Sequence, residues 1–182
     1  MAGSLIKVDE FTISSPVASV ILGGGSSGSS GLNASIDSTY DVYMVVANNV
    51  TPDTDSQNFR FRVTESGTPN ITSNYDYAHK FFTTGGAFGN FADTNQTSIR
   101  FVSTGTATGE QTNQVVYVFN ANNSSEYTFF TQEQSQLNET STLTGVQGGG
   151  VFTSTSTVDG LSFFFQSGNI ASGTFTLYGL KK

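Results

Sequence analysis

The residues that could carry catalysis are few in this chain, beginning with its single histidine, His79. A histidine that acts as a general base needs a nucleophile within hydrogen-bonding reach and a carboxylate that orients the imidazole ring. Asp76 lies close to His79 in sequence, but nothing in the spacing places a nucleophile beside the pair. We therefore interpret His79 as a strand-edge residue beside Lys80, and the sequence predicts no enzyme.

A calcium site is the next candidate, because Asp53 and Asp55 lie in a segment that resembles the opening of a calcium-binding loop. The glycine that such loops carry at their centre is missing, although Glu65 falls near the place of the closing acidic ligand. We therefore expect the two aspartates to form a turn. With one histidine and no cysteine, a zinc site is not expected, and the sequence predicts no metal and no cofactor.

Aromatic side chains offer a different chemistry, because exposed rings stack on sugars in carbohydrate-binding sandwiches. The candidates for such a glycan contact are Tyr75, Tyr77, Phe88 and Phe91, with Tyr40 as a further exposed aromatic residue. The alternative is that these rings anchor loops on the core, and the sequence leaves both interpretations open. A pair of carboxylates in a glycoside hydrolase or lyase would need a cleft whose geometry sequence spacing does not reveal.

The composition limits the partners of the chain. Charged residues make up only 12% of its 182 residues, against about 25% in ordinary globular domains. The net charge is −7, so the chain has no basic patch for a phosphate backbone, and nucleic acid and anionic membranes are poor partners. No apolar run approaches the length of a spanning helix, and the first residues do not resemble a signal peptide, which predicts synthesis in a cytoplasm.

Alternation of apolar and polar residues predicts strands throughout, most clearly at Phe59–Val63. Only 132–150 lacks a period, and a short helix could lie there; 85–89 is expected to be a loop with buried aromatic anchors. Eight to eleven strands predict one all-β domain over 1–182, a jelly-roll-like β-sandwich. The expected strands are Leu5–Ile13, Val17–Leu22, Tyr40–Val46, Phe59–Val63, Tyr75–Phe82, Ser98–Val102, Gln114–Asn120, Tyr127–Thr131, Val151–Ser156, Leu161–Gln166 and the final run to Leu180.

Two segments of this single domain carry more specific expectations. The glycine- and serine-rich tract 23–31 resembles a linker, but too few residues precede it for an independent core, so we expect a dispensable loop. The C-terminal run 161–180 is expected to form two strands joined by a turn at 167–169, with the last strand inserted beside earlier ones.

Three segments give the chain a resemblance to a known group of proteins. Asp41–Asp55 ends in Asn-Val-Thr-Pro-Asp-Thr-Asp, Phe59–Val63 follows with Arg-Phe-Arg, and Ser172–Gly179 closes on Leu-Tyr-Gly. With these features the chain resembles, from Leu5 to its C-terminus, proteins encoded by tailed bacteriophages, notably marine ones. The resemblance implies a virion structural protein, such as a capsid decoration, a head fibre or a tail-fibre module. It supplies no catalytic residues.

The resemblance and the composition together predict a non-enzymatic virion component that is made in the host cytoplasm and forms a homo-oligomer. Its partners are expected to be other virion proteins of the capsid or tail. Residues 1–13, set apart by Pro16, are the expected attachment arm, with Leu5, Ile6, Val8 and Phe11 as its contact residues. The alternative function is a glycan-binding module of a tail fibre that meets the host surface.

Overall fold

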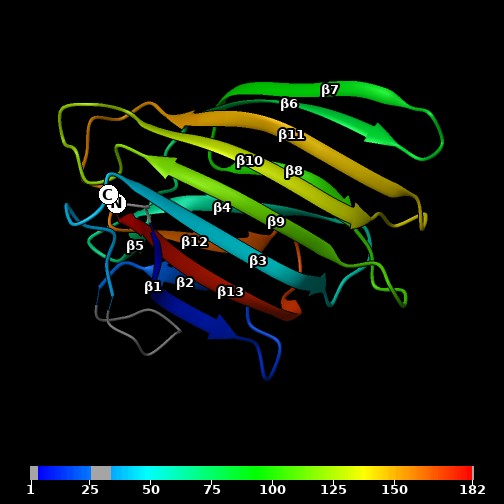
Figure 1. Ribbon diagram of the computed structural model, residues 1–182. Coiled ribbons are helices and arrows are strands. Elements are labelled where there is room, and N and C mark those ends of the chain that lie inside the picture. The colour runs from blue at the N-terminus through cyan, green and yellow to red at the C-terminus, as the bar shows by residue number, and fades with distance from the viewer. Residues whose placement is uncertain (1–3, 26–33, 182) are drawn as a thin grey trace.

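A computed structural model describes residues 4–25 and 34–181, which fold into two antiparallel β-sheets that face each other (Figure 1). The eight-stranded sheet has the order β1 (Ser4–Thr12), β13 (Ile170–Lys181), β3 (Val42–Pro52), β9 (Thr112–Phe119), β10 (Thr128–Leu137), β11 (Leu143–Phe152), β6 (Tyr75–Thr83) and β7 (Phe88–Gln96). The five-stranded sheet consists of β2 (Val20–Gly23), β12 (Gly160–Phe165), β4 (Gln57–Glu65), β5 (Thr68–Pro69) and β8 (Ile99–Thr104). The predicted all-β sandwich is confirmed.

The wiring joins the first strands to the last, as expected for a jelly-roll-like sandwich. β1 pairs with β13 and β2 pairs with β12, and β13 lies between β1 and β3. The prediction that the last strand is inserted beside earlier ones is therefore confirmed. β12 and β13 belong to different sheets, however, so residues 161–180 do not form a hairpin; the turn between them carries the chain from one sheet to the other.

The expectation of a short helix within 132–150 is wrong. Gln132–Leu137 continue β10, and Leu143–Gly150 belong to β11, with the two strands paired from Thr128↔Phe152 to Leu137↔Leu143. Burial alternates residue by residue along β10, but the buried positions include three glutamines. The two-residue alternation of a strand is therefore present in the structure. A count of apolar residues does not reveal it, because the buried residues are polar. The glycines of β11 likewise hide its strand pattern in the sequence.

The predicted loop at 85–89 also needs correction. The turn is shorter, because β7 begins at Phe88 and pairs with β6 through Phe82↔Phe88. Phe88 is not a buried anchor, since 71% of its surface is exposed. β7 forms one edge of the eight-stranded sheet, where only one neighbouring strand is available to cover it.

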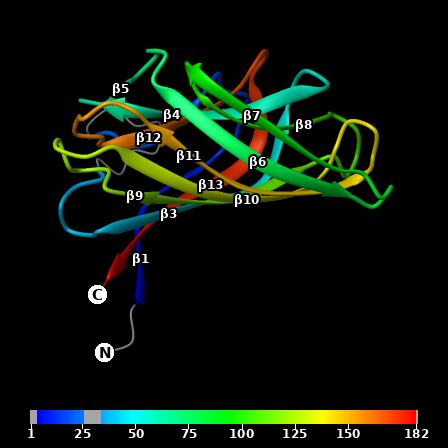
Figure 2. The same ribbon diagram turned by 90° about the horizontal axis from the view of Figure 1, so that it is seen from above.

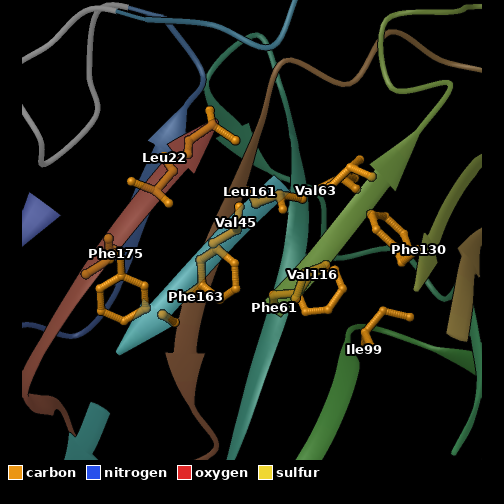
Figure 3. Packing of buried hydrophobic residues seen from close by; sticks show 14 of the residues in the cluster. Leu22, Val45, Phe61, Val63, Ile99, Val116, Phe130, Leu161, Phe163 and Phe175 are labelled. Carbon is orange, nitrogen blue, oxygen red and sulfur yellow. The ribbon is translucent and has the colours of Figure 1, made fainter. Parts of the chain in front are cut away.

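The core lies between the sheets and is rich in phenylalanine (Figure 3). Phe59 and Phe61 of β4 point inward, as their spacing predicts, and both are completely buried. The Phe61 ring lies 5.0 Å from that of Phe130 of β10, which joins the two sheets through an edge-to-face contact. On the opposite side of β4, the Arg62 guanidinium lies 4.3 Å from the centre of the Phe164 ring.

The start of the glycine- and serine-rich tract is part of the fold. The backbone N–H of Gly23 donates to Asp9 Oδ2 at 2.9 Å, and that of Gly24 donates to the Asp159 carbonyl at 2.7 Å. A shortened tract must therefore keep these two glycines. Positions 26–31 lie outside the described residues, so the expectation of a dispensable loop there stays a prediction.

The N-terminal segment is an edge strand of the sheet, where the sequence suggested an arm apart from the core. β1 pairs with β13 from Ser4↔Lys181 to Thr12↔Thr174, with a bulge at Val8. Val8 and Phe11 are partly buried against the core, and Asp9 is buried. Because Asp9 also holds Gly23, deletion of residues 1–13 is expected to destabilise the domain.

Candidate functional site

The outer face of the eight-stranded sheet points away from the five-stranded sheet. No other described element lies over β3, β9 and β10 on this side (Figure 2). The start of β1 and the end of β13 extend outward beyond the body of the sandwich on the same side (Figure 2). Any partner of the sheet would meet these strands first.

The strand register arranges the outward side chains of this face in four rows that cross the strands. The first row, nearest the chain termini, contains Val42, Phe119, Phe129, Val151 and Asp76. The second row contains Lys7, Tyr178, Met44, Tyr117, Thr131, Gly149, Ala78 and Ala92. The third row contains Glu10, Thr176, Val46, Val115, Glu133, Gln147, Lys80 and Asn90. The fourth row contains Asn113, Ser135, Gly145, Phe82 and Phe88.

An apolar patch occupies one end of this face. It consists of exposed or half-buried side chains on β1, β13, β3, β9, β10 and β11: Leu5, Leu180, Tyr178, Val42, Val46, Val115, Tyr117, Phe119, Phe129 and Val151. Phe129 is 47% exposed and Tyr117 is 39% exposed. Soluble monomers rarely expose contiguous apolar surface of this kind, and where they do it usually marks a binding site.

Two hollows interrupt the outer face. The first, of about 650 Å³, lies where the in-register residues Gly149, Ala78 and Ala92 leave space between the walls formed by Phe129 and Asp76. The second, of about 420 Å³, lies at the other end of the same strands, where Ser135 and Glu133 separate Val46 from the ring of Phe82. Phe82 is 57% exposed, and its ring lies over Gly145 at the border of the second hollow, as Phe129 lies at the border of the first.

The outer face is nearly neutral although the chain is acidic. Its four rows carry two lysines, Lys7 and Lys80, against the three carboxylates of Glu10, Asp76 and Glu133, which leaves one negative charge. The whole chain carries −7. Lys7 and Glu10 approach each other at 3.4 Å on β1, and Lys80 lies 5.5 Å above the ring of Phe88. Most of the net charge therefore lies away from this face.

The predicted attachment residues divide into two groups. Leu5 and Ile6 are exposed, at 49% and 38%, near the outward-extending start of β1. Val8 and Phe11 pack partly against the core and offer less surface to a partner. Leu5 faces Leu180 of β13 and belongs to the apolar patch, whereas Ile6 pairs with Gly179 and points to the other side of the strand.

The four predicted glycan-contact residues do not form one exposed site. Tyr75 and Tyr77 are core residues, and burial raises the pKa of Tyr77 to about 12. The Tyr75 hydroxyl donates to the Asn70 carbonyl at 2.9 Å, which anchors a loop to the core. Phe91 packs on the His79 ring, with 4.7 Å between ring centres. Of the four, Phe88 alone is well exposed, and Tyr75 and Tyr77 follow the alternative in which the rings pack on the core.

His79 is buried on the inner side of β6, where its ring contacts Gln132, Phe91 and Tyr77. Asp76 lies on the opposite, outer side of the same strand, so the two do not pair. Burial lowers the pKa of His79 to about 4, which keeps the imidazole neutral at neutral pH. The arrangement is that of a core histidine on a strand between β11 and β7, whereas the sequence suggested a histidine at a strand edge.

Acid is expected to destabilise the domain through His79. Its folded-state pKa of about 4 lies below the ordinary 6.5, so the unfolded chain binds the additional proton between these values and stability falls as pH falls. The full difference is worth about 3 kcal/mol, of which roughly 2 kcal/mol is lost between pH 7 and pH 5. Thermal melts at pH 7 and pH 5 should show a loss for the wild type and a smaller one for His79→Gln. Equal losses in the two proteins would contradict this role.

Asp53 and Asp55 hold turns, as the sequence suggested. The Asp53 carboxylate accepts hydrogen bonds from the backbone N–H and side-chain amide of Asn169, both at 2.8 Å, and these bonds lower its pKa. Asp55 accepts a bond from the Thr106 N–H at 3.2 Å. Within residues 4–25 and 34–181, no three His, Cys, Asp or Glu side chains gather as a metal site would require.

A row of buried glutamines, Gln132, Gln134 and Gln136, lies beneath the outer face and was not expected from the sequence. The Gln134 amide accepts from the Val102 N–H at 3.2 Å and donates to the Val102 carbonyl at 3.3 Å, so a side chain continues the pairing of β8. Gln136 likewise donates to the Ser103 carbonyl. The signal in the sequence is the spacing of glutamine at every second residue from 132 to 136.

Comparisons of the chain with protein-family models and with curated proteins find no match. In the part of the chain that the structure describes, no helix is long and apolar enough to cross a membrane.

Proposed function

We propose that this protein is a non-enzymatic structural component of a bacteriophage virion, which binds a neighbouring virion protein through the outer face of its eight-stranded sheet. The observation that carries the proposal is the apolar patch, ten side chains from six strands with no other described element over them. The resemblance of Asp41–Asp55, Phe59–Val63 and Ser172–Gly179 to phage proteins supports the kind of assembly.

The chemistry of the face suits a protein partner. Phe129, Tyr117 and Tyr178 supply large rings on rigid strands, and such aromatic anchors dominate the energetics of protein interfaces. Polar and charged residues, including Glu133 and Lys80, lie towards the β6 side and the far end of the strands. An apolar centre with a polar border is the usual anatomy of an interface.

The face is a better candidate than the exposed edge at β1. Edge strands invite pairing with a neighbouring chain unless they are blunted by bulges or charges. β1 carries a bulge at Val8, the inward-pointing Asp9 and the charged pair Lys7 and Glu10. These features discourage a further strand, and they leave the apolar patch as the larger accessible surface.

Particle analysis tests the proposal. Purified particles made from the genome that encodes the chain should contain it in stoichiometric amounts by mass spectrometry. A Phe129→Ser variant should fold normally and lose most of its incorporation, because the ring is half exposed and contacts the partner. Ile71→Ser is the matched control, with 68% exposure in the loop between β5 and β6. Particles without the chain, or equal incorporation of both variants, would overturn the proposal.

Glycan binding is a second candidate function, favoured by the first hollow. A half-exposed ring, Phe129, and a carboxylate, Asp76, face the same space of about 650 Å³, and sugar sites combine stacking with hydrogen bonds. Its contact residues, Phe129 and Asp76, differ from the four aromatic residues expected from the sequence. A saccharide array decides it: a specific sugar whose binding is lost in Phe129→Ala supports it, and an array without signal removes it.

A further inference from the structure

We propose that the outer face is a self-complementary interface, in which two copies of this chain pack face to face about a two-fold axis that crosses the strands. The inference rests on the proposed function, because it assigns a partner to the same apolar patch. In a two-fold interface the same surface serves both copies, so each protrusion must meet a recess of the same face.

The axis runs across the sheet midway between the second and third rows. It passes over Val116 of β9, Gln132 of β10 and Gly148 of β11, which are in register with one another. Rotation about this line keeps every strand opposite its own copy and reverses its direction. The first row then faces the fourth row of the other copy, and the second row faces the third.

The two exposed phenylalanines match the two hollows under this rotation. Phe129, in the first row on β10, is carried over the place of Ser135, in the fourth row on β10, where the second hollow lies. Phe82, in the fourth row on β6, is carried over the place of Asp76, in the first row on β6, which borders the first hollow. Each exposed ring therefore meets a recess, and both matches come from one operation.

Several contacts between the two central rows agree in character. Tyr117 comes to lie over Val115 of the other copy, and Met44 over Val46, so apolar side chains meet at the centre. Lys7 of each copy comes to lie over Glu10 of the other, which places opposite charges together at the border. The near neutrality of the face removes the repulsion that two acidic chains would otherwise feel there. Sheets packed in this way lie about 10 Å apart, with aligned strands.

Sedimentation equilibrium tests the pairing in solution. The wild-type chain should form a dimer, and Phe82→Ser and Phe129→Ser should each weaken it by about tenfold or more, since each removes an anchor from its recess. Both rings are exposed in the isolated domain, so the variants should fold like the wild type, which circular dichroism spectra verify, and their melting temperature should fall only because the dimer is weaker. Ile71→Ser, with its side chain in the loop between β5 and β6, should leave the dimer unchanged. A monomeric wild type overturns the proposal.

Cross-linking tests the position of the axis, because the chain has no cysteine and an introduced thiol is unique. Thr131→Cys lies one residue from the axis, so its two copies should be joined by a short bis-maleimide. Ser135→Cys, on the same strand and the same face, is the control. Its copies would lie about 20 Å apart along the strands, and they should not be joined. Joining at Ser135→Cys, or at neither position, would overturn this axis.

The two proposals fail in distinguishable ways. A chain that is monomeric in solution but enters particles through Phe129 would overturn the two-fold dimer and support the structural function, with another virion protein as the occupant of the face. A chain that forms the cross-linked dimer but is missing from particles would support the self-complementary interface and overturn the structural function.

Discussion

A chain that ends after Asn169 is expected not to fold. The missing strand, β13, lies between β1 and β3, so its loss removes two rows of backbone hydrogen bonds at once. It also removes Phe175 and Leu177, which are completely buried and point into the core (Figure 3 shows Phe175). β1 would then have no partner in the sheet, and β3 would be left with an open edge.

The size of the loss decides the outcome. Burial of each of these two side chains contributes about 1.5–3 kcal/mol, and the total stability of a domain is about 5–15 kcal/mol. The lost backbone pairs and the exposed core add to this deficit. The 1–169 fragment should lack near-ultraviolet circular dichroism and a cooperative thermal transition, whereas a chain ending after Leu180 should keep both. A soluble 1–169 fragment that melts cooperatively would contradict the prediction.

The sandwich could be predicted from the sequence because most of its strands alternate in the usual way. Phe59–Val63 places its apolar residues inward and its arginines outward, and this pattern alone identifies β4. β10 could not be followed to its end, because its inward positions beyond Phe130 are occupied by glutamines. Polar side chains can be buried when they find hydrogen-bond partners, and the partners of Gln134 come from β8, more than thirty residues away.

The candidate site was harder to predict, because alternation does not tell which side of a strand is covered. Val115–Phe119 is apolar on both sides, so its sequence does not show which side meets the core. The structure buries Val116 and Val118 and leaves Tyr117 at the surface, so the second apolar side is part of the patch. Tyr75 and Tyr77 are the opposite case, because they are candidates for surface contacts in the sequence and are buried in the structure. Only the pairing of β6 with β11 and β7 reveals that their side of the strand faces the core.

Replacement of Phe59 by alanine is expected to lower the free energy of unfolding by about 3–5 kcal/mol. Phe59 is completely buried at the centre of a cluster in which its ring lies 5.0 Å from that of Phe165, 5.7 Å from Phe101 and 5.8 Å from Phe163. These neighbours belong to β8 and β12, on either side of β4, so the cavity left by the ring would lie between three strands. Paired strands held in register collapse poorly into such a space, which places the cost towards the upper end of the range.

Phe88→Ala is the control for this substitution, since it removes the same atoms from a ring that is 71% exposed on the edge strand β7. Its effect should stay within about 0.5 kcal/mol. Urea denaturation of both variants, followed by the change in tyrosine fluorescence, measures the two free energies under the same conditions. Similar midpoints for Phe59→Ala and the wild type would show that the cluster is not the centre of the core. In that case the contacts between Phe61 and Phe130 would have to hold the two sheets together.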